Sequence, residues 1–243
     1  QNVVILADDF ANWEKPTSRS YWAYQLFHNT PNFKNLRYAF TAYTTWAQAN
    51  DTESAEVVRQ KWYDMIDTYA EYDNYYYIEK NGQKYPVVSI LEEKALVTVF
   101  DSAFGSYGTN KTRAFYEEIA TRFKEKGFPG VALFCGNSIS QFNTGQELAY
   151  FESIGILRYK SSYVPNYIPQ SSFVGLKTYS EVVDSFAPEA DDYAIQSIAT
   201  SIDTQTPHES NWVCKGSNPA DFRRWLEKAI SHLDANPSMP RII

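Results

Sequence analysis

The segment spanning residues 75–91 constrains the fold more than any other part of the sequence. A run of aromatic residues leads to Asn81-Gly82, which favours a turn because glycine accepts a positive φ without steric cost. The apolar run 86–91 follows, and it places Pro86 at the first strand position, where a missing N–H is tolerated. A short, nearly continuous apolar strand flanked by helical patterns is typical of a parallel sheet that is covered on both faces.

The same alternation of apolar strands and helical patterns continues along the chain. Apolar runs predict strands at residues 3–7, 36–43, 86–91, 131–134, 156–159 and 195–202, and the start of another at 241–243. Apolar residues at helical spacing predict helices at residues 16–27, 53–70, 115–127, 144–155, 178–186 and 218–233. Thr144 and Thr178 each stand three residues before a glutamate, which is the pattern of a capping box. Asn218 followed by Pro219 predicts the N-cap and first residue of the last helix.

This order predicts an α/β fold built from parallel βα units. We expect a (β/α)8 TIM-type barrel that forms a single domain over residues 1–243 and is incomplete at both ends. Seven strand starts can be counted, the last of them incomplete, so one strand would precede Gln1. An open doubly wound sheet is the alternative, but no glycine-rich phosphate turn follows the first strand. Because missing strands expose sheet edges, we expect further chain or a partner to complete the barrel.

Charge and apolar patterning exclude two classes of partner. The net charge is −7 and no basic cluster exceeds a few residues, which argues against nucleic acid. No apolar run approaches the roughly 20 residues that a membrane span needs. Residues 1–6 begin as a strand without a basic leader, so we expect a mature, trimmed or excised chain.

The two cysteines indicate no metal site, and we expect neither a metal nor another cofactor. Cys135 lies in an apolar run, where a buried thiol is the simplest interpretation. A bridge between Cys135 and Cys214 remains open, because sequence gives no distance between them.

In a barrel of this kind, ligands bind where strands end and loops begin. Carboxylates and amides can hydrogen-bond sugar hydroxyls, and indole or phenol rings can stack on sugar faces. The predicted substrate-binding residues follow the strand ends and are Asp8, Asp9, Asn12, Trp13, Tyr43, Trp46, Asn137, Tyr159, Asp203, His208 and Trp212.

Each of these residues also has a plainer explanation. Asp8 and Asp9 would also serve as helix caps, and Asp203 would also form an Asx turn. Glu92 and Glu93 follow the strand 86–91, where we interpret them as a solvated helix start rather than a catalytic pair. Aromatic residues make up 16% of the chain, and most are expected in the core.

Five segments carry a family resemblance. They are LRYAFTAYTTW at residues 36–46, the 75–91 segment, Lys-Gly-Phe-Pro-Gly-Val at 126–131, Ser-Ile-Asp-Thr-Gln-Thr-Pro at 201–207 and Asn-Pro-Ala-Asp-Phe at 218–222. With the early strand at residues 3–9, their order resembles the WbsX-like proteins and glycoside hydrolase families 99 and 71. The chain departs from the family pattern at Ile202, where the family has tryptophan, and at His208, where it has arginine.

The resemblance implies an endo-acting glycosidase of mannan-like polymers, or a saccharide-processing role in surface-polysaccharide loci. It also implies that the catalytic carboxylates lie beyond Ile243, so no residue of this chain inherits a catalytic role. We therefore expect a glycoside hydrolase-like domain whose partner is an oligo- or polysaccharide. The alternative is a non-catalytic glycan-binding or surface-polysaccharide assembly protein that retains the barrel. The first reading fits a secreted, periplasmic or cell-surface protein, and a biosynthetic role fits a cytoplasmic one.

Overall fold

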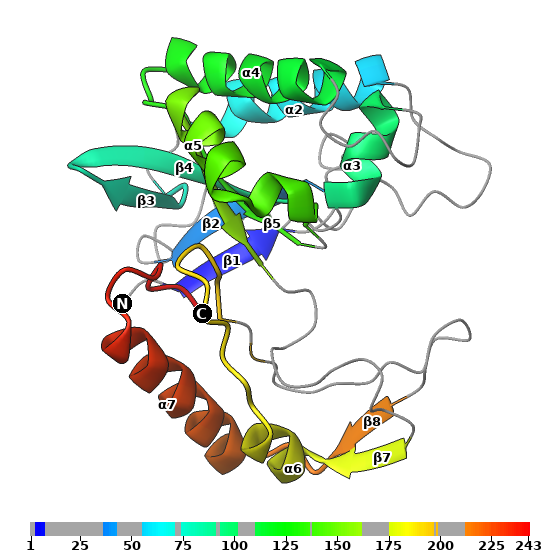
Figure 1. The fold of residues 1–243 in the computed structure, drawn as a ribbon, viewed down its shortest axis with the longest axis vertical. Coiled ribbons are helices and arrows are strands. Elements are labelled where there is room, and N and C mark those ends of the chain that lie inside the picture. Colours follow the sequence, from blue (N-terminus) through cyan, green and yellow to red (C-terminus); the bar gives the residue numbers. More distant parts are fainter. Residues whose placement is uncertain are drawn as a thin grey trace. The chain divides into compact units, whose positions relative to one another are not determined.

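The structure is a computed structural model that describes residues 3–7, 36–42, 55–70, 74–90, 93–101, 110–136, 138–161, 175–196, 198 and 212–243. For residues 3–7, 36, 69, 95, 110, 175–177 and 212–215 it describes the backbone alone. The chain divides into two compact units, Gln1–Tyr159 and Lys160–Ile243 (Figure 1).

The first unit is built on a mostly parallel sheet. Its strands are β1 (Val3–Ala7), β2 (Leu36–Ala42), β4 (Gln83–Ile90), β5 (Val131–Cys135) and β6 (Ile156–Lys160), and they lie in that order across the sheet. The neighbours from β1 through β5 pair in parallel. The predicted α/β class is therefore confirmed, and the strands at 3–7, 36–43, 131–134 and 156–159 are found close to their predicted bounds.

A hairpin extends β4 at its amino end. Strand β3 (Tyr77–Lys80) pairs antiparallel with β4 through a turn at Asn81 and Gly82, whose φ angles are 53° and 73°. This confirms the predicted turn, because two positive φ values are typical of the tight hairpin turns that match strand twist. The prediction for Pro86 was wrong: β4 begins at Gln83, so Pro86 lies inside the strand. The ladder continues past it, since the Val87 N–H donates to the Tyr76 carbonyl at 3.0 Å.

Residues 74–76 lie between β2 and the start of β4. The Tyr38 N–H donates to the Asn74 carbonyl at 3.2 Å, and the Tyr76 N–H donates to the Tyr38 carbonyl at 2.7 Å. The buried Tyr75 hydroxyl donates to the Val87 carbonyl at 2.7 Å and accepts from the Phe40 N–H at 3.4 Å. A side-chain hydroxyl thus satisfies backbone groups that the ladder leaves unpaired at this end of the sheet.

Helices cover one face of this sheet. They are α2 (Ala55–Tyr69), α3 (Glu93–Phe100), α4 (Asn110–Glu125) and α5 (Gly145–Ser153), with a short 3-10 helix, η2 (Ser140–Asn143), before α5. Figure 1 shows α2 and α4 running side by side, and the two helices are in contact. Phe115 of α4 stacks on Phe100 at 4.2 Å between ring centroids and meets Trp62 edge-on at 5.6 Å. These rings join Phe40, Ile90 and Leu133 of the sheet in one apolar core.

The helix ends largely follow the sequence signals. After α4 the chain turns at Gly127 with φ 87°, and the Phe128 N–H donates to the Phe123 carbonyl at 3.1 Å, as predicted for a glycine stop. The Thr144 hydroxyl accepts from the Glu147 N–H at 3.3 Å, which is half of the predicted capping box. The other half is not formed, because the Glu147 carboxylate pairs with Arg113 at 2.6 Å instead.

The second unit contains a small parallel sheet and two capped helices. Strands β7 (Gly175–Thr178) and β8 (Trp212–Lys215) pair in parallel and lead into α6 (Tyr179–Asp184) and α7 (Pro219–Ala235). The full capping box at Thr178 is confirmed, with Glu181 as its second member. Asn218 caps α7 as predicted by accepting from the Asp221 N–H at 2.9 Å.

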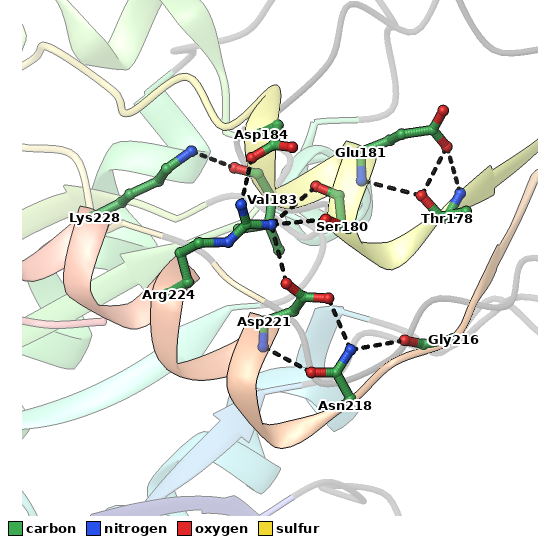
Figure 2. Close-up of polar contacts among 10 residues, drawn as sticks. All are labelled: Thr178, Ser180, Glu181, Val183, Asp184, Gly216, Asn218, Asp221, Arg224 and Lys228. Atoms are coloured by element: carbon green, nitrogen blue, oxygen red, sulfur yellow. Dashed lines mark hydrogen bonds and ion pairs between the residues drawn. The ribbon is translucent and has the colours of Figure 1, made fainter.

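Arg224 joins the two helices of this unit, as Figure 2 shows. Its guanidinium donates to the Asp184 carboxylate at 2.8 Å, the Ser180 hydroxyl at 2.9 Å and the Asp221 carboxylate at 3.0 Å. One turn further along α7, the Lys228 ammonium donates to the Val183 carbonyl at 2.7 Å. The Lys228 contact lies at the carboxyl end of α6, where a basic side chain can hydrogen-bond one of the last carbonyl groups of a helix.

Two predicted strands are not found among the described residues, and one predicted helix lies outside them. Residues 241–243 form no strand, because the Ile242 N–H bonds locally to the Pro240 carbonyl at 2.8 Å and Ile243 is 43% exposed. Of the strand predicted at 195–202, residues 195, 196 and 198 are not in a strand, although Ala194 forms a parallel bridge to Lys160. The helix predicted at 16–27 lies outside the described residues.

The close approach of two glycines generates a stability prediction. Gly130, with φ 152°, lies so close to Gly155 that a Cβ at position 130 would stand 1.7 Å from the Gly155 carbonyl oxygen. We expect Gly130→Ala to destabilise the chain by about 3 kcal/mol, because backbone must move to accommodate the methyl group. Gly145 is the matched control, since a Cβ there meets nothing within 4 Å and its φ is not positive. Urea unfolding of both variants measures the difference, and equal midpoints would contradict the close approach.

Candidate functional site

The carboxyl ends of the parallel strands define the candidate site. Strands β1, β2, β4 and β5 end at Ala7, Ala42, Ile90 and Cys135, and all four ends lie at one edge of the sheet because the strands run in the same direction. Three predicted site residues come directly after or close behind these ends: Asp8 after β1, Tyr43 after β2 and Asn137 after β5. The predicted site residues outside the described residues are Asp8, Asp9, Asn12, Trp13, Tyr43, Trp46, Asn137, Asp203 and His208.

Two predicted site residues are described. Trp212 is the first residue of β8, a strand that the sequence pattern did not predict, and its backbone pairs with Gly175. Tyr159 lies on β6, is half-buried and meets the Phe134 ring edge-on at 5.8 Å. Burial raises the pKa of Tyr159, with a smaller contribution from the charge of Glu152, so the phenol stays protonated at neutral pH.

Phe134 belongs to a row of residues on the sheet face opposite the helices. In the strand register, Thr41 stands beside Ser89, and Ser89 stands beside Phe134. Their sequence neighbours pack with the helices, so these three point to the other face by strand alternation. Thr41, Ser89 and Phe134 are buried at 5–6% exposure. This face of the sheet therefore carries two buried hydroxyls beside an aromatic ring.

A buried charged group, Glu93, lies where β4 passes into α3. Its carboxylate accepts from the Tyr116 hydroxyl at 2.9 Å, the Ile139 N–H at 2.9 Å and the Arg158 guanidinium. Its own N–H donates to the Gly136 carbonyl at 3.0 Å. Glu93 is fully buried, so its interpretation as a solvated helix start was wrong. The reason is its partner Arg158, which comes 65 residues later and leaves no local pattern.

Arg158 is the counter-charge, and its side chain is 1% exposed on β6. Its guanidinium donates to Glu93 and to the Asn143 side-chain oxygen, and it lies over the Phe142 and Phe151 rings at 5.7 and 5.8 Å from their centroids. An arginine within an apolar strand was the one sequence signal for this pair. A buried charge requires a partner, and sequence alone does not identify which one.

Two further titratable groups border the pair. Burial raises the pKa of the Tyr116 phenol well above its usual range, and the Glu93 charge adds to the shift. Burial likewise raises the pKa of the Cys135 thiol, with Arg158 opposing the shift and Glu93 adding to it. Cys135 is fully buried and its thiol is free, which confirms the predicted buried thiol. Neither group is ionised at neutral pH, so the thiol is not a nucleophile.

The buried contacts that Glu93 makes with Tyr116, Ile139 and Arg158 hold the structure together and leave no reactive group exposed among these four residues. Both oxygens of Glu93 are engaged by buried donors, and none of the partners faces open solvent. Among the described residues, no group of three or more histidine, cysteine or acidic side chains could hold a metal ion. No helix in the described parts of the chain is long and apolar enough to span a bilayer.

A shallow hollow of about 410 Å³ lies on the helical side of the first unit. Its lining includes Tyr63, Glu117, Glu118 and Arg122. Glu118 pairs with Arg59 at 2.7 Å and accepts from the Tyr63 hydroxyl at 3.0 Å, and Glu117 accepts from Tyr150 at 2.6 Å. These partners explain the acidic residues as links between helices.

Comparison with known proteins gives no relative. No protein-family model matches the chain, and neither a curated protein nor a solved structure matches it.

The buried ion pair generates the second prediction. We expect Glu93→Gln to lower the free energy of unfolding by about 3–5 kcal/mol, because the Arg158 guanidinium stays buried without its counter-charge. The exposed pair Lys80–Glu152 is the matched control, with side chains 41% and 59% exposed. Lys80→Gln should cost less than about 1 kcal/mol, as surface pairs usually do. Urea unfolding monitored by circular dichroism compares them, and similar losses would show that Glu93 is not buried as described.

Proposed function

We propose that the chain forms most of a (β/α)8-type barrel that binds an oligo- or polysaccharide, as a glycoside hydrolase-like domain. The strand order carries this proposal. Five strands lie in the sheet in their sequence order, β1-β2-β4-β5-β6, as successive strands of a barrel do. A doubly wound sheet would reverse that order at its ligand-binding crevice.

The residues that follow the strand ends support the choice of ligand. Asp8 follows β1, Tyr43 follows β2 and Asn137 follows Gly136 at the end of β5. In the proposed site, these side chains and those of Asp9 and Asn12 hydrogen-bond sugar hydroxyls. Trp13, Trp46 and Tyr159 supply stacking surfaces for the sugar rings. In the second unit, Asp203, His208 and Trp212 remain predicted sugar-binding residues.

Catalysis and simple binding are separate versions of this proposal. In the first, the domain is an endo-acting hydrolase of a mannan-like polymer whose catalytic carboxylates lie beyond Ile243, as the WbsX-like and family 99 resemblance implies. In the second, it is a non-catalytic glycan-binding or surface-polysaccharide assembly protein. Glu93 is not a catalytic carboxylate in either version, because buried donors engage both of its oxygens. Hydrolysis or glycan binding suits a secreted, periplasmic or cell-surface protein, and a role in polysaccharide biosynthesis suits a cytoplasmic one.

Glycan binding tests the proposal directly. We expect soluble α-mannan and α-manno-oligosaccharides to bind the chain in isothermal titration calorimetry. Asp8→Asn should weaken that binding by about tenfold, because it removes a charged acceptor worth about 1.5 kcal/mol or more. Glu79→Gln, which removes one charge from the exposed hairpin, should leave affinity unchanged.

Release of oligosaccharides from α-mannan, followed by reducing-end analysis, separates hydrolysis from binding alone. The proposal fails if no glycan binds, or if Asp8→Asn and Glu79→Gln bind equally well.

A further inference from the structure

A chain of hydrogen bonds runs from the buried Glu93 to a hydroxyl at the exit of β5. Glu93 accepts from Arg158, Arg158 donates to the Asn143 side-chain oxygen, and the Asn143 amide nitrogen donates to the Ser138 hydroxyl at 2.9 Å. This series of hydrogen bonds begins at the fully buried Glu93 carboxylate and ends at the half-buried Ser138 hydroxyl.

Each step of this chain fixes the polarity of the next. A guanidinium has only donors, so Asn143 must turn its oxygen toward Arg158. The amide nitrogen of Asn143 then faces Ser138, and the Ser138 oxygen acts as the acceptor. A serine hydroxyl that accepts in this way keeps its own hydrogen for donation. Among the described residues, no acceptor for that hydrogen is found.

Ser138 also lies at the sheet edge that the parallel strands share. The Gly136 N–H donates to the Ile90 carbonyl at 2.7 Å, and the Gly136 carbonyl accepts from the Glu93 N–H at 3.0 Å. On the other side of Ser138, the Ile139 N–H donates to the Glu93 carboxylate at 2.9 Å. The backbone is thus anchored to Glu93 on both sides of the hydroxyl.

We propose that Ser138 is an additional ligand-binding residue, whose hydroxyl the Glu93–Arg158–Asn143 chain presents as a hydrogen-bond donor. Its ligand atom is an acceptor oxygen of a saccharide, such as a hydroxyl or ring oxygen. This inference rests on the proposed function. The Ser138 hydroxyl adds a hydrogen-bond donor of fixed direction to the carboxyl edge of the sheet, where several of the predicted sugar-binding residues are carboxylates that only accept. Asn143 and Arg158 act as positioning residues.

Two variants test the binding role and the positioning role. Ser138→Ala removes the donor, and we expect α-manno-oligosaccharide affinity to fall about three- to tenfold, the loss typical of one hydrogen bond. Asn143→Asp keeps an oxygen for Arg158 but offers Ser138 only an acceptor, so the serine hydrogen turns toward residue 143. The Asn143→Asp variant should therefore reduce affinity to a similar degree. The double variant Ser138→Ala/Asn143→Asp should bind no more weakly than either single variant, because both changes remove the same donor.

Ser153→Ala is the matched control, because that exposed hydroxyl bonds only the Tyr150 carbonyl of its own helix. It should bind as the unmodified chain does, and urea unfolding midpoints establish that every variant is folded. If either test variant binds as tightly as the unmodified chain, or if the two losses add, the inference about Ser138 is overturned while the proposed function stands. If the unmodified chain binds no glycan, the proposed function falls and this inference with it.

Discussion

The first unit depends on one ion pair that is entirely removed from water. Burying two opposite charges costs several kcal/mol each, and the cost is recovered only where further hydrogen bonds complete the pair. Here the Tyr116 hydroxyl and the Ile139 N–H donate the further hydrogen bonds to the Glu93 carboxylate, and the Asn143 side-chain oxygen accepts one from the Arg158 guanidinium. Because these partners come from α4, the chain after β5 and the end of η2, a single pair fixes how the helices join the carboxyl edge of the sheet. An apolar pair would fill the volume without specifying that arrangement.

The order of the strands gives that edge its functional interest. When each strand is added beside its predecessor in the same direction, all the connections leave from one side. Polar residues that lie far apart in the sequence then come together at the carboxyl edge of the sheet, although no local sequence motif links them. Ser89 and Thr41 show the same effect within the sheet, where strand register places side by side two hydroxyls that lie 48 positions apart in the sequence.

Local signals in the sequence were reliable where the physics is local. The turn at Asn81-Gly82 and the caps at Thr178 and Asn218 depend on neighbouring residues, and they are found as predicted. The box at Thr144 is half formed because a distant arginine, Arg113, competes for its glutamate.

Glu93 was misread for the same reason, since only Arg158 and Tyr116 reveal that it is buried. The four-residue strands β3, β7 and β8 were missed because so short a strand carries little apolar alternation. Of the predicted sugar-binding residues, the structure describes Tyr159 with its side chain and Trp212 with its backbone alone. Tyr159 lies inside β6, and Trp212 begins β8, a strand that was not predicted.

Tyr75 and Tyr116 give the chain an alkaline limit. Burial raises the pKa of both phenols, so they remain neutral in the folded protein, whereas an unfolded tyrosine ionises near pH 10. Above that pH the unfolded chain releases protons that the folded chain retains, and stability falls as pH rises. Because the Tyr75 hydroxyl also bridges β2 and β4, its ionisation would remove the hydrogen bond that it donates to the Val87 carbonyl.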